Sequence, residues 1–453
     1  MSTIAAISTP NAVGGIAVIR ISGERALAVA EKIFRPYGEK IVAEMQGYTC
    51  AYGIAHDDGE RIDDCILTVF RAPHSYTGED TCEISCHGGL YVSKCILRAA
   101  LKNGAVSAES GEFTKRAFLN GKLDLTQAEA VMDVISARGE AELRMAEQLR
   151  EGAAYKKARE CSDRLLKILS GIAAWTDYPD EDIPEIEPTA IKSELTAIRG
   201  ELASLIRNYD SGRILREGVA TAIVGRPNVG KSTLFNCLSG CERSIVTDIA
   251  GTTRDVVEET VRLGDIVLRL SDTAGIHDTE DIIEGIGIDI AEKTAKNAEL
   301  VIAVFDGNCP LSADDFNLIN KINNKNCIAV VNKSDREQLI ESEKLSQFFK
   351  HIVYISAKQN EGIEQLENAV KELFLINSES FSVATASNER QKQCIERAIC
   401  SVDEGIGIIE SSEMYDALNV VLDDAEQSLL ELSGQKITEA VVDEVFSRFC
   451  VGK

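Results

Sequence analysis

Apolar and polar positions divide the first part of the chain into two kinds of segment. Mostly apolar runs at 16–21, 65–70 and 81–85 alternate with turn-rich stretches such as 56–59, which predicts an α+β domain. From about Leu123, apolar residues recur at helical spacing, at positions 125, 128, 132 and 135. We therefore expect long helices from this point up to Pro179, where an acidic, proline-containing connector over 177–188 breaks them.

The segment from Val219 to about Leu375 has another pattern, in which an apolar strand, a polar loop and a helix repeat. The predicted strands cover 220–224, 266–270, 300–305, 327–331 and 352–355. Such alternation is typical of a mostly parallel sheet with helices on both faces. Helices are expected on either side of this segment, over about 189–209 with Thr189 as N-cap and from Asn388 to Phe449.

These patterns predict a multidomain chain with an inserted domain. The expected parts are an α+β N-terminal domain at 1–118, an all-α helical domain split between 119–216 and 379–453, and an inserted α/β domain at 217–378. Insertion into a helical domain is plausible because the two ends of a domain often lie close together.

Composition and charge limit the compartment and the partners that we expect for this chain. No stretch approaches the roughly 20 apolar residues of a membrane span, and no basic start precedes the first apolar run as in a secretory signal. The 13 scattered cysteines suit a reducing compartment, so we expect a cytoplasmic protein without a membrane partner. Because the net charge is -25, any RNA contact would need a local basic patch or a partner's surface.

Two cysteine spacings invite a zinc interpretation. Cys82, Cys86 and His87 form one group, and Cys237 with Cys241 forms the other. Neither group has a second pair at the distance of a zinc ribbon. Small buried apolar side chains are the favoured interpretation.

The strongest motif is Gly-Arg-Pro-Asn-Val-Gly-Lys-Ser at 225–232, between a predicted strand and a predicted helix. Its glycines allow backbone N–H groups to surround phosphate oxygens at the N-terminus of the helix. Lys231 is expected to reach the β and γ phosphates, and the Ser232 hydroxyl is expected to bind magnesium. The motif predicts a P-loop nucleotide site.

Three further motifs follow later strands of the same domain. Asp272 begins Asp-Thr-Ala-Gly at 272–275 and is placed to act on magnesium through water. Asp335 ends Asn-Lys-Ser-Asp at 332–335 and would accept two hydrogen bonds from guanine that adenine cannot donate. Ser-Ala-Lys at 356–358 would back the base. Four motifs in order at the carboxyl ends of strands predict a GTPase domain.

The region 217–375 resembles the translation-factor-related GTPases, in which Ala-Gly-Thr-Thr-Arg-Asp at 250–255 would be the switch segment. That resemblance makes Thr253 the second magnesium ligand, beside Ser232. The expected GTP-binding residues are Asn228, Val229, Gly230, Lys231, Ser232, Thr233, Thr247, Asp248, Ile249, Thr253, Asp272, Thr273, Ala274, Gly275, Asn332, Lys333, Asp335, Ser356, Ala357 and Lys358.

Catalysis needs a cation that the sequence does not supply directly. Ile276 follows the Asp-x-x-Gly turn, where many signalling GTPases carry a glutamine, and its side chain cannot orient water. No arginine finger can be assigned, yet charge develops between the β and γ phosphates.

Signatures outside the GTPase region extend a resemblance over the whole chain. They are 18–23, 75–80 with Glu83 and 87–89, 111–114 with 116–120 and 122–125, the connector 177–181, and the final Phe-Cys-Val-Gly-Lys at 449–453. Together they resemble the MnmE (TrmE) family of tRNA modification GTPases. The loop 9–15 departs from the more glycine- and arginine-rich loop expected in that family. We therefore expect details of the family's folate contact or dimer packing to differ here, but not the family itself.

For GTP hydrolysis, the resemblance implies a potassium ion (K+) in place of an arginine finger, in addition to Mg2+. The implied potassium ligands are Asn228, Thr247, Ile249 and Thr252, completed when two GTPase domains meet. Glu284 would orient the attacking water through a second water. From the residues alone, Asn228 can also be a loop-capping amide, and Glu284 can equally be an exposed carboxylate at a helix start.

The resemblance also implies a homodimer, formed by an N-terminal domain that binds a tetrahydrofolate derivative (5-formyl or methylene). Arg20, Glu83, Lys122 and Lys453 would contact the folate. Cys450 is a candidate nucleophile if its thiol pKa is lowered, or it anchors the tail by packing.

The resemblance further implies a flavoprotein partner, MnmG (GidA), and a heterotetramer of the two proteins. FAD and NADH would act only through this partner. Together the two proteins would add a carboxymethylaminomethyl or aminomethyl group to carbon 5 of the wobble uridine of certain tRNAs. GTP hydrolysis would open and close the dimer. The chain has no Gly-x-Gly-x-x-Gly motif after a strand, in keeping with redox chemistry elsewhere.

Two other functions remain open at this point. One is a ribosome-assembly or translation GTPase that acts only as a switch, and the other is a folate-responsive regulatory protein that modifies nothing. The folate-type positions and the Cys-x-Gly-Lys end favour the RNA-modifying enzyme, because an assembly switch has no need of them.

Overall fold

The structure of the chain, a computed structural model, divides into two compact units. It describes residues 1–137, 139–177, 187–207, 209–240, 259–264, 266–270, 298–322, 326–374, 386–411 and 415–453. Unit 1 comprises Met1–Ile135, Glu147–Ala203 and Glu389–Lys453, and unit 2 comprises Ser136–Ala146 and Ser204–Asn388. Unit 2 is therefore inserted into the sequence of unit 1.

Unit 1 begins with a seven-stranded sheet in the order β3-β4-β5-β6-β2-β1-β7. Its strands are β1 (Ile4–Ile7), β2 (Ile16–Ser22), β3 (Phe34–Pro36), β4 (Thr49–Asp57), β5 (Glu60–Phe70), β6 (Thr81–His87) and β7 (Val106–Ser107). Neighbouring strands are antiparallel except for the parallel pair β1 and β7. Asp58 and Gly59 both have positive φ in the turn from β4 to β5, which is the backbone that a tight hairpin prefers.

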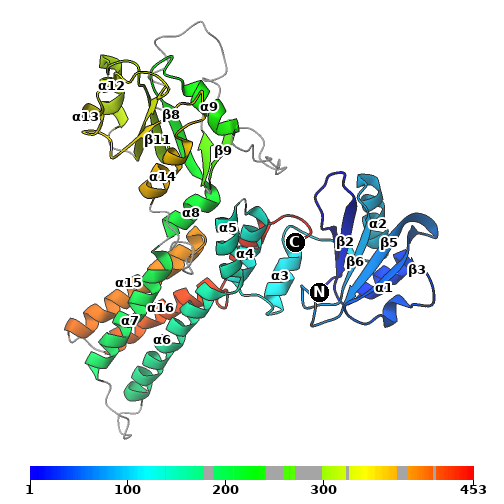
Figure 1. Cartoon of the computed structure of the whole chain (residues 1–453). Helices are drawn as coiled ribbons and strands as arrows, with labels where there is room; N and C mark the ends of the chain where they lie inside the picture. Colours follow the sequence, from blue (N-terminus) through cyan, green and yellow to red (C-terminus); the bar gives the residue numbers. More distant parts are fainter. Residues whose placement is uncertain are drawn as a thin grey trace. The chain divides into compact units, whose positions relative to one another are not determined.

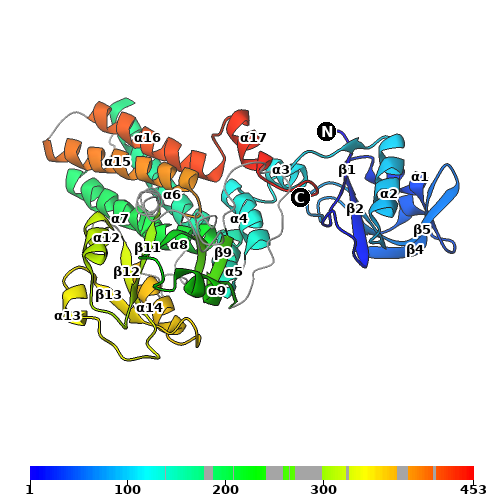
Figure 2. The same ribbon diagram turned by 90° about the horizontal axis from the view of Figure 1, so that it is seen from above.

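One face of this sheet is covered by helices. These are α1 (Ala26–Ile33) and α2 (Leu90–Lys102) (Figure 2). A short 3-10 helix, η1 (Val42–Glu44), contacts α1. Alternate residues of the strands, such as Ile19 and Ile84, are fully buried with Val29 and Ile96 of the helices. Cys82 and Cys86 belong to the same core, where burial raises the pKa of their thiols to about 12 and about 11.

Helices that precede and follow the main segment of unit 2 in the sequence complete unit 1. They are α3 (Glu112–Leu119), α4 (Leu125–Ser136), α6 (Ala153–Asp177), α7 (Pro188–Ile206), α15 (Glu389–Ser411), α16 (Tyr415–Ser433) and α17 (Glu439–Ser447), and α5 (Glu140–Arg150) crosses into unit 2. The long helices α6, α7, α15 and α16 lie side by side (Figure 1). Their buried apolar residues, among them Leu165, Leu195 and Leu422, recur at helical spacing and form a shared core.

The helix expected over 189–209 differs in the structure. It begins at Pro188 and ends at Ile206, and a separate helix, α8 (Tyr209–Glu217), follows. The prediction of Thr189 as N-cap is wrong, because proline suits the first helical position and starts the helix one residue earlier.

Unit 2 contains a six-stranded sheet in the order β13-β12-β11-β8-β10-β9. Its strands are β8 (Val219–Val224), β9 (Glu259–Leu263), β10 (Ile266–Leu270), β11 (Leu300–Asp306), β12 (Cys327–Asn332) and β13 (His351–Tyr354). All neighbours are parallel except β9 and β10. The other helices of this unit are α9 (Lys231–Gly240), α12 (Ala313–Ile322), α13 (Ser342–Leu345) and α14 (Ile363–Leu373).

Helices bury both faces of this sheet, as the strand pattern predicts. On one face Leu234 of α9, Leu215 of α8 and Leu366 of α14 form a core with the strands, and Met145 of α5 joins it. On the other face Ile319 of α12 and Leu345 of α13 pack with Phe305. The described part of the chain has no helix with the length and apolarity of a membrane span.

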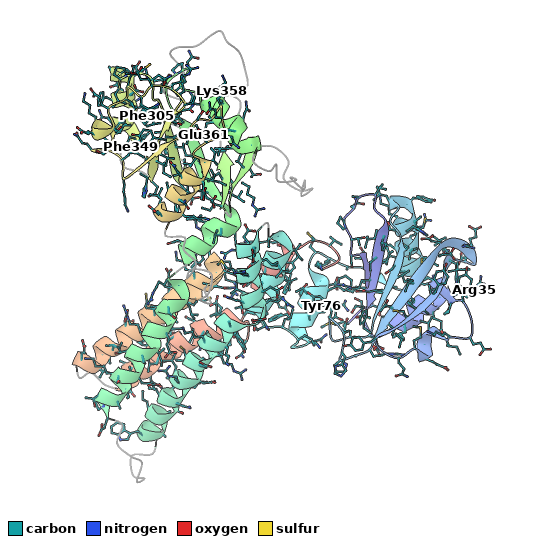
Figure 3. All side chains as sticks on the ribbon, viewed as in Figure 1. Arg35, Tyr76, Phe305, Phe349, Lys358 and Glu361 are labelled. Atoms are coloured by element: carbon teal, nitrogen blue, oxygen red, sulfur yellow. The ribbon has the colours of Figure 1, made fainter. Side chains whose placement is uncertain are left out.

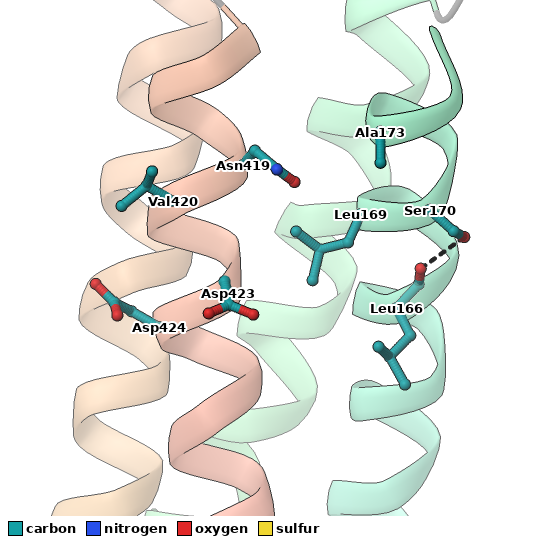
Figure 4. Close-up of a pocket in the computed structure, with 8 residues that line it drawn as sticks. All are labelled: Leu166, Leu169, Ser170, Ala173, Asn419, Val420, Asp423 and Asp424. Atoms are coloured by element: carbon teal, nitrogen blue, oxygen red, sulfur yellow. Dashed lines mark hydrogen bonds between the residues drawn. The ribbon is translucent and has the colours of Figure 1, made fainter. Parts of the chain in front are cut away.

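A surface groove lies between α6 and α16 (Figure 4). It is lined by Leu166, Leu169, Ser170, Ala173, Asn419, Val420, Asp423 and Asp424. No residue of the sequence-predicted sites lines this groove.

Candidate functional site

The phosphate-loop motif forms the turn from β8 to α9, at the carboxyl end of a central strand. Gly225 has φ +156°, and a Cβ on this residue would lie 2.5 Å from the Val304 carbonyl oxygen. Gly230 has φ +98°, and a Cβ there would lie 2.3 Å from Nδ2 of Asn332. Glycine at both positions is therefore required for this conformation of the loop.

Lys231 lies at the start of α9 and folds back over this loop. Its Nζ donates to the carbonyl oxygens of Gly225 at 2.9 Å and Arg226 at 2.8 Å. Burial lowers the pKa of this ammonium group. A residue of α12 also holds the loop, because Arg226 Nε lies 2.8 Å from Oδ1 of the buried Asp315.

Asn332 joins three loops at the carboxyl edge of the sheet. Its side chain is 3% exposed, and Nδ2 donates to the Val229 carbonyl oxygen at 3.0 Å. Its Oδ1 accepts from the backbone N–H groups of Lys333 at 2.8 Å and Ala357 at 3.1 Å. The loops at 225–232, 332–335 and 356–358 therefore lie together at the carboxyl edge of the sheet, to which the parallel strands β8, β12 and β13 lead them.

The Asp335 carboxylate is held by the loop at 356–358. Its Oδ1 accepts a 2.7 Å hydrogen bond from the Ser356 hydroxyl. This hydrogen bond is the main cause that lowers the pKa of Asp335, so the group is ionised at neutral pH. Lys358 and Glu361 follow on an exposed loop of the same unit (Figure 3).

Asp306 is a residue of this site that the sequence analysis missed. It ends β11 and is the register partner of Asn332 on β12. Its Oδ2 lies 2.6 Å from Nζ of Lys333, which also donates to the Asn228 carbonyl oxygen at 3.2 Å. A signal was present in the sequence, because Asp306 is a polar residue that ends a buried strand, as Asn332 does.

A second cluster of predicted residues lies in unit 1, around Arg20 of β2. Arg20 Nε lies 2.8 Å from Oε1 of Glu83, its register partner on β6. The guanidinium carbon is 5.5 Å from the ring centroids of both Tyr76 and Phe113. Figure 3 labels Tyr76, whose hydroxyl lies 2.9 Å from Oγ1 of Thr114 on α3. Sequence analysis missed the two rings, because contacts between separate segments leave no local pattern.

The C-terminal tail lies against the same cluster. The Gly452 carbonyl oxygen accepts from Ser8 Oγ at 3.0 Å and from Arg20 Nη1 at 3.5 Å. The Lys453 carbonyl oxygen accepts from the N–H of Phe113 at 3.1 Å. Arg20, Glu83 and the backbone of Lys453 are therefore brought together, and the exposed Cys450 is three residues away along the tail.

Lys122 is placed differently from the other three predicted folate contacts. Its Nζ donates to the Pro73 carbonyl oxygen at 3.0 Å, and its side chain lies close to Gly78. In the part of the chain that the structure describes, it has no hydrogen bond to Arg20, Glu83 or Lys453.

The remaining predicted residues lie outside the described ranges. They are Thr247, Asp248, Ile249, Thr252, Thr253, Asp272, Thr273, Ala274, Gly275 and Glu284.

Two family models together match nearly the whole chain. The model of the TrmE N-terminus, a GTP-binding protein, matches residues 3–122, and the model of the MnmE helical domain matches residues 125–450. The tRNA modification GTPase MnmE of Clostridioides difficile is 42% identical over 454 residues, which cover 100% of this chain and 99% of the relative. The chain belongs to the MnmE family.

Other relatives have the same name and span. The tRNA modification GTPase MnmE of Acetivibrio thermocellus is 40% identical and that of Geobacillus kaustophilus is 39% identical, each over 100% of this chain and 99% of the relative. Among solved structures, the G domain of the T. maritima FeoB iron transporter is 26% identical and covers 34% of this chain and 96% of its own length, with a TM-score of 0.26. As an MnmE family member, the chain is a tRNA modification GTPase, and unit 2 contains its P-loop GTPase fold.

Proposed function

We propose that GTP binds at the carboxyl edge of the unit 2 sheet. The observation that carries this proposal is the position of Asn332, which connects the phosphate loop to the loops at 332–335 and 356–358. Lys231 would exchange its two loop carbonyls for phosphate oxygens, because an ammonium in a partly dry site interacts more strongly with an anion than with dipoles. Asp335 would accept two hydrogen bonds from guanine.

The residues at this site fit magnesium and potassium ions as hard cations. Ser232, in the first turn of α9, and Thr253 would hold Mg2+ through hydroxyl oxygens. Asn228, Thr247, Ile249 and Thr252 would hold K+ through side-chain and backbone oxygens. The two ions would supply positive charge near the phosphates, and Glu284 would orient the attacking water through a second water.

We further propose that the cluster around Arg20 binds a tetrahydrofolate derivative. A guanidinium that lies over the exposed ring of Tyr76 and is paired with a carboxylate offers a stacking surface, a donor and an acceptor for a heterocycle. Lys453 would add a charge from the tail, and Lys122 would have to leave the Pro73 carbonyl to take part. Cys450 is a candidate nucleophile beside this cluster.

In this proposal, the chain acts as a homodimer with the flavoprotein MnmG, in the cytoplasm, on carbon 5 of the wobble uridine of certain tRNAs. The N-terminal domain, proposed at 1–118, would form the dimer. Tyr52 and Ile66 are register partners on the uncovered sheet face and are 58% and 46% exposed, which suits a surface that a second copy covers. FAD and NADH would act only through the partner.

Three measurements test the proposal in its parts. GTP hydrolysis by the full chain is compared in KCl and NaCl, and equal rates would remove the potassium role. Calorimetric titration with 5-formyltetrahydrofolate should give binding that Glu83→Gln weakens, whereas Glu60→Gln, at the exposed start of β5 in the same sheet, leaves it unchanged. Wobble-uridine nucleosides in tRNA from a deletion strain should lack the carbon-5 group, and unchanged nucleosides would contradict the modification role.

A further inference from the structure

Lys333 and Asn228 are both in the left-handed region of backbone space, although neither is glycine. Their φ values are +67° and +64°. This region is unfavourable for a residue with a Cβ, and such residues are found where the surrounding structure imposes the conformation for function. The two residues are bonded to each other, because Lys333 Nζ donates to the Asn228 carbonyl oxygen at 3.2 Å.

Asp306 is the group that holds the Lys333 ammonium at this carbonyl. Its Oδ2 lies 2.6 Å from Nζ, and its Oδ1 accepts from the Asn308 N–H at 3.0 Å. Only 14% of the Asp306 side chain and 29% of the Lys333 side chain are exposed, so water screens this pair weakly. Burial acts to raise the pKa of Asp306, but the bonds from Lys333 and Asn308 outweigh it and the pKa is lowered.

The loop that bears Asp306 is itself fixed to the loop that bears Lys333. The Gly307 N–H donates to the Asn332 carbonyl oxygen at 3.0 Å, and Gln338 Nε2 donates to the Lys333 carbonyl oxygen at 3.0 Å. A Cβ on Gly307 would lie 2.9 Å from the Asn332 carbonyl oxygen, so the two strand ends pass as closely as glycine permits. Asp306 therefore has a fixed position from which to direct the ammonium.

We propose that Asp306 is a positioning residue of the GTP site, which acts through Lys333 to hold the phosphate loop at Asn228 in its left-handed form. The carboxylate orients one ammonium hydrogen toward the Asn228 carbonyl, so the loop is ordered before the nucleotide arrives. The inference rests on the GTP site proposed above and adds a residue to it. Asp306 touches neither the phosphates nor the base in this account.

The test compares nucleotide binding by the full chain and by Asp306→Asn, with a fluorescent GDP analogue as probe. Asparagine keeps the shape of the side chain and removes its charge. Because a charge-assisted hydrogen bond is lost, the Kd is expected to rise about tenfold. The KM for GTP should rise by a similar factor, whereas kcat at saturating GTP should change less than about twofold, since bound nucleotide restores the loop.

A double-mutant cycle separates positioning from a general structural role. If Asp306 acts through Lys333, then Asp306→Asn added to Lys333→Met should change the Kd by less than about twofold, although each single change raises it. Glu341→Gln is the matched control, because Glu341 forms an exposed ion pair with Lys344 in the same unit and should leave the Kd unchanged.

Several results would overturn the inference. They are an unchanged Kd in Asp306→Asn, additive effects in the cycle, or a lowered melting temperature without any change in Kd. If Asp306→Asn does not fold, Asp306→Glu replaces it in both backgrounds, and its longer arm should give an intermediate shift only when Lys333 is present. A parent chain that binds no guanine nucleotide would instead refute the proposed site itself.

Discussion

Asn332 Nδ2 lies 3.0 Å from the carbonyl oxygen of Val229, across the gap between β12 and the phosphate loop. This hydrogen bond and the two that Asn332 Oδ1 accepts are made by a side chain that is almost fully buried. Three separate loops therefore depend on one amide, and a change at this position should affect local stability and nucleotide binding together.

Asn332→Ala should destabilise the carboxyl edge of the unit 2 sheet. A buried group left without its partner costs about 1–3 kcal/mol, and the alanine leaves the Val229 carbonyl and two N–H groups without theirs. Hydrogen exchange of the β11 and β12 amides should accelerate, and GDP affinity should fall. Asn326→Ala, at an exposed position before β12, serves as control, and equal exchange in the two variants would contradict the role of Asn332.

Asn228 offers a test of the potassium proposal that separates backbone from side chain. Asn228→Gly accepts the φ of +64° without strain and removes the side-chain oxygen, whereas Asn228→Ala removes the oxygen and adds strain. If the oxygen is a potassium ligand, the ratio of the hydrolysis rate in KCl to the rate in NaCl should fall about tenfold or more in both variants. A normal KCl response in Asn228→Gly would show that Asn228 serves the backbone alone.

The pair Arg390 and Glu129 should dominate the stability of the helical part of unit 1. Arg390 Nε and Nη2 lie 2.8 Å and 2.9 Å from the two Glu129 oxygens, and Gln391 Nε2 donates to the same carboxylate at 2.6 Å. Arg390→Met removes the countercharge of this buried carboxylate and leaves it the Gln391 hydrogen bond, at an expected cost of about 3–5 kcal/mol.

Urea unfolding followed by tryptophan fluorescence measures this cost, because the chain's one tryptophan, Trp175, lies in α6 of unit 1. Arg448→Met is the control. Arg448 pairs with Glu444 at the surface, 2.8 Å apart, and such pairs contribute at most about 1 kcal/mol. Equal effects of the two substitutions would be evidence against a special role of Arg390.

Glu426 should make the stability of unit 1 depend on pH. Its side chain is buried, and burial raises its pKa above the ordinary 4.5; Asp163 and Asp423 add to this, while the bond from Ser162 and the charge of Lys436 oppose it. The folded chain therefore holds this proton more tightly than the unfolded chain. The stabilising contribution is present below pH 4.5 and is lost as the pH rises through the folded-state pKa.

Glu426→Gln should keep the bond to Ser162 without the buried charge. We expect its unfolding midpoint to exceed that of the parent at pH 7.5, with a smaller difference at pH 4.5. Glu404→Gln, on the exposed side of α15, should show no such pH-dependent gain. A midpoint below the parent at pH 7.5 would mean that the charge has a stabilising partner.

Periodicity predicted the sheet of unit 2 well, because buried parallel strands are short apolar runs that polar loops interrupt. Four of its five predicted strands differ from the structure by one residue at an end or not at all, as Ile266–Leu270 shows. The proposed GTP site could be located from the sequence for the same reason, since Asn332 ends a strand and the phosphate loop follows one. Asp306 ends a strand too, but it belongs to none of the four motifs.

Contacts between distant segments could not be predicted in this way. The stacking of Arg20 on Tyr76 and Phe113 joins three segments whose separation in sequence contains no periodic signal. The start of α7 at Pro188 instead of after Thr189 shows a second limit. Pro188 favours the first position of the helix and Thr189 favours the N-cap, and the sequence pattern alone does not show which of the two preferences is stronger.

The contribution of α5 to unit 2 has a practical consequence for anyone who isolates the nucleotide-binding part. Met145, 6% exposed, is embedded among the apolar side chains of α8, α9 and the strands, yet all of α6 and α7 separate it from these elements in the sequence. An excised fragment of residues 204–388 would retain every nucleotide motif but lack Met145, and its core would contain a cavity at that position. Low activity in such a fragment would then reflect a damaged interior and not the chemistry of the enzyme.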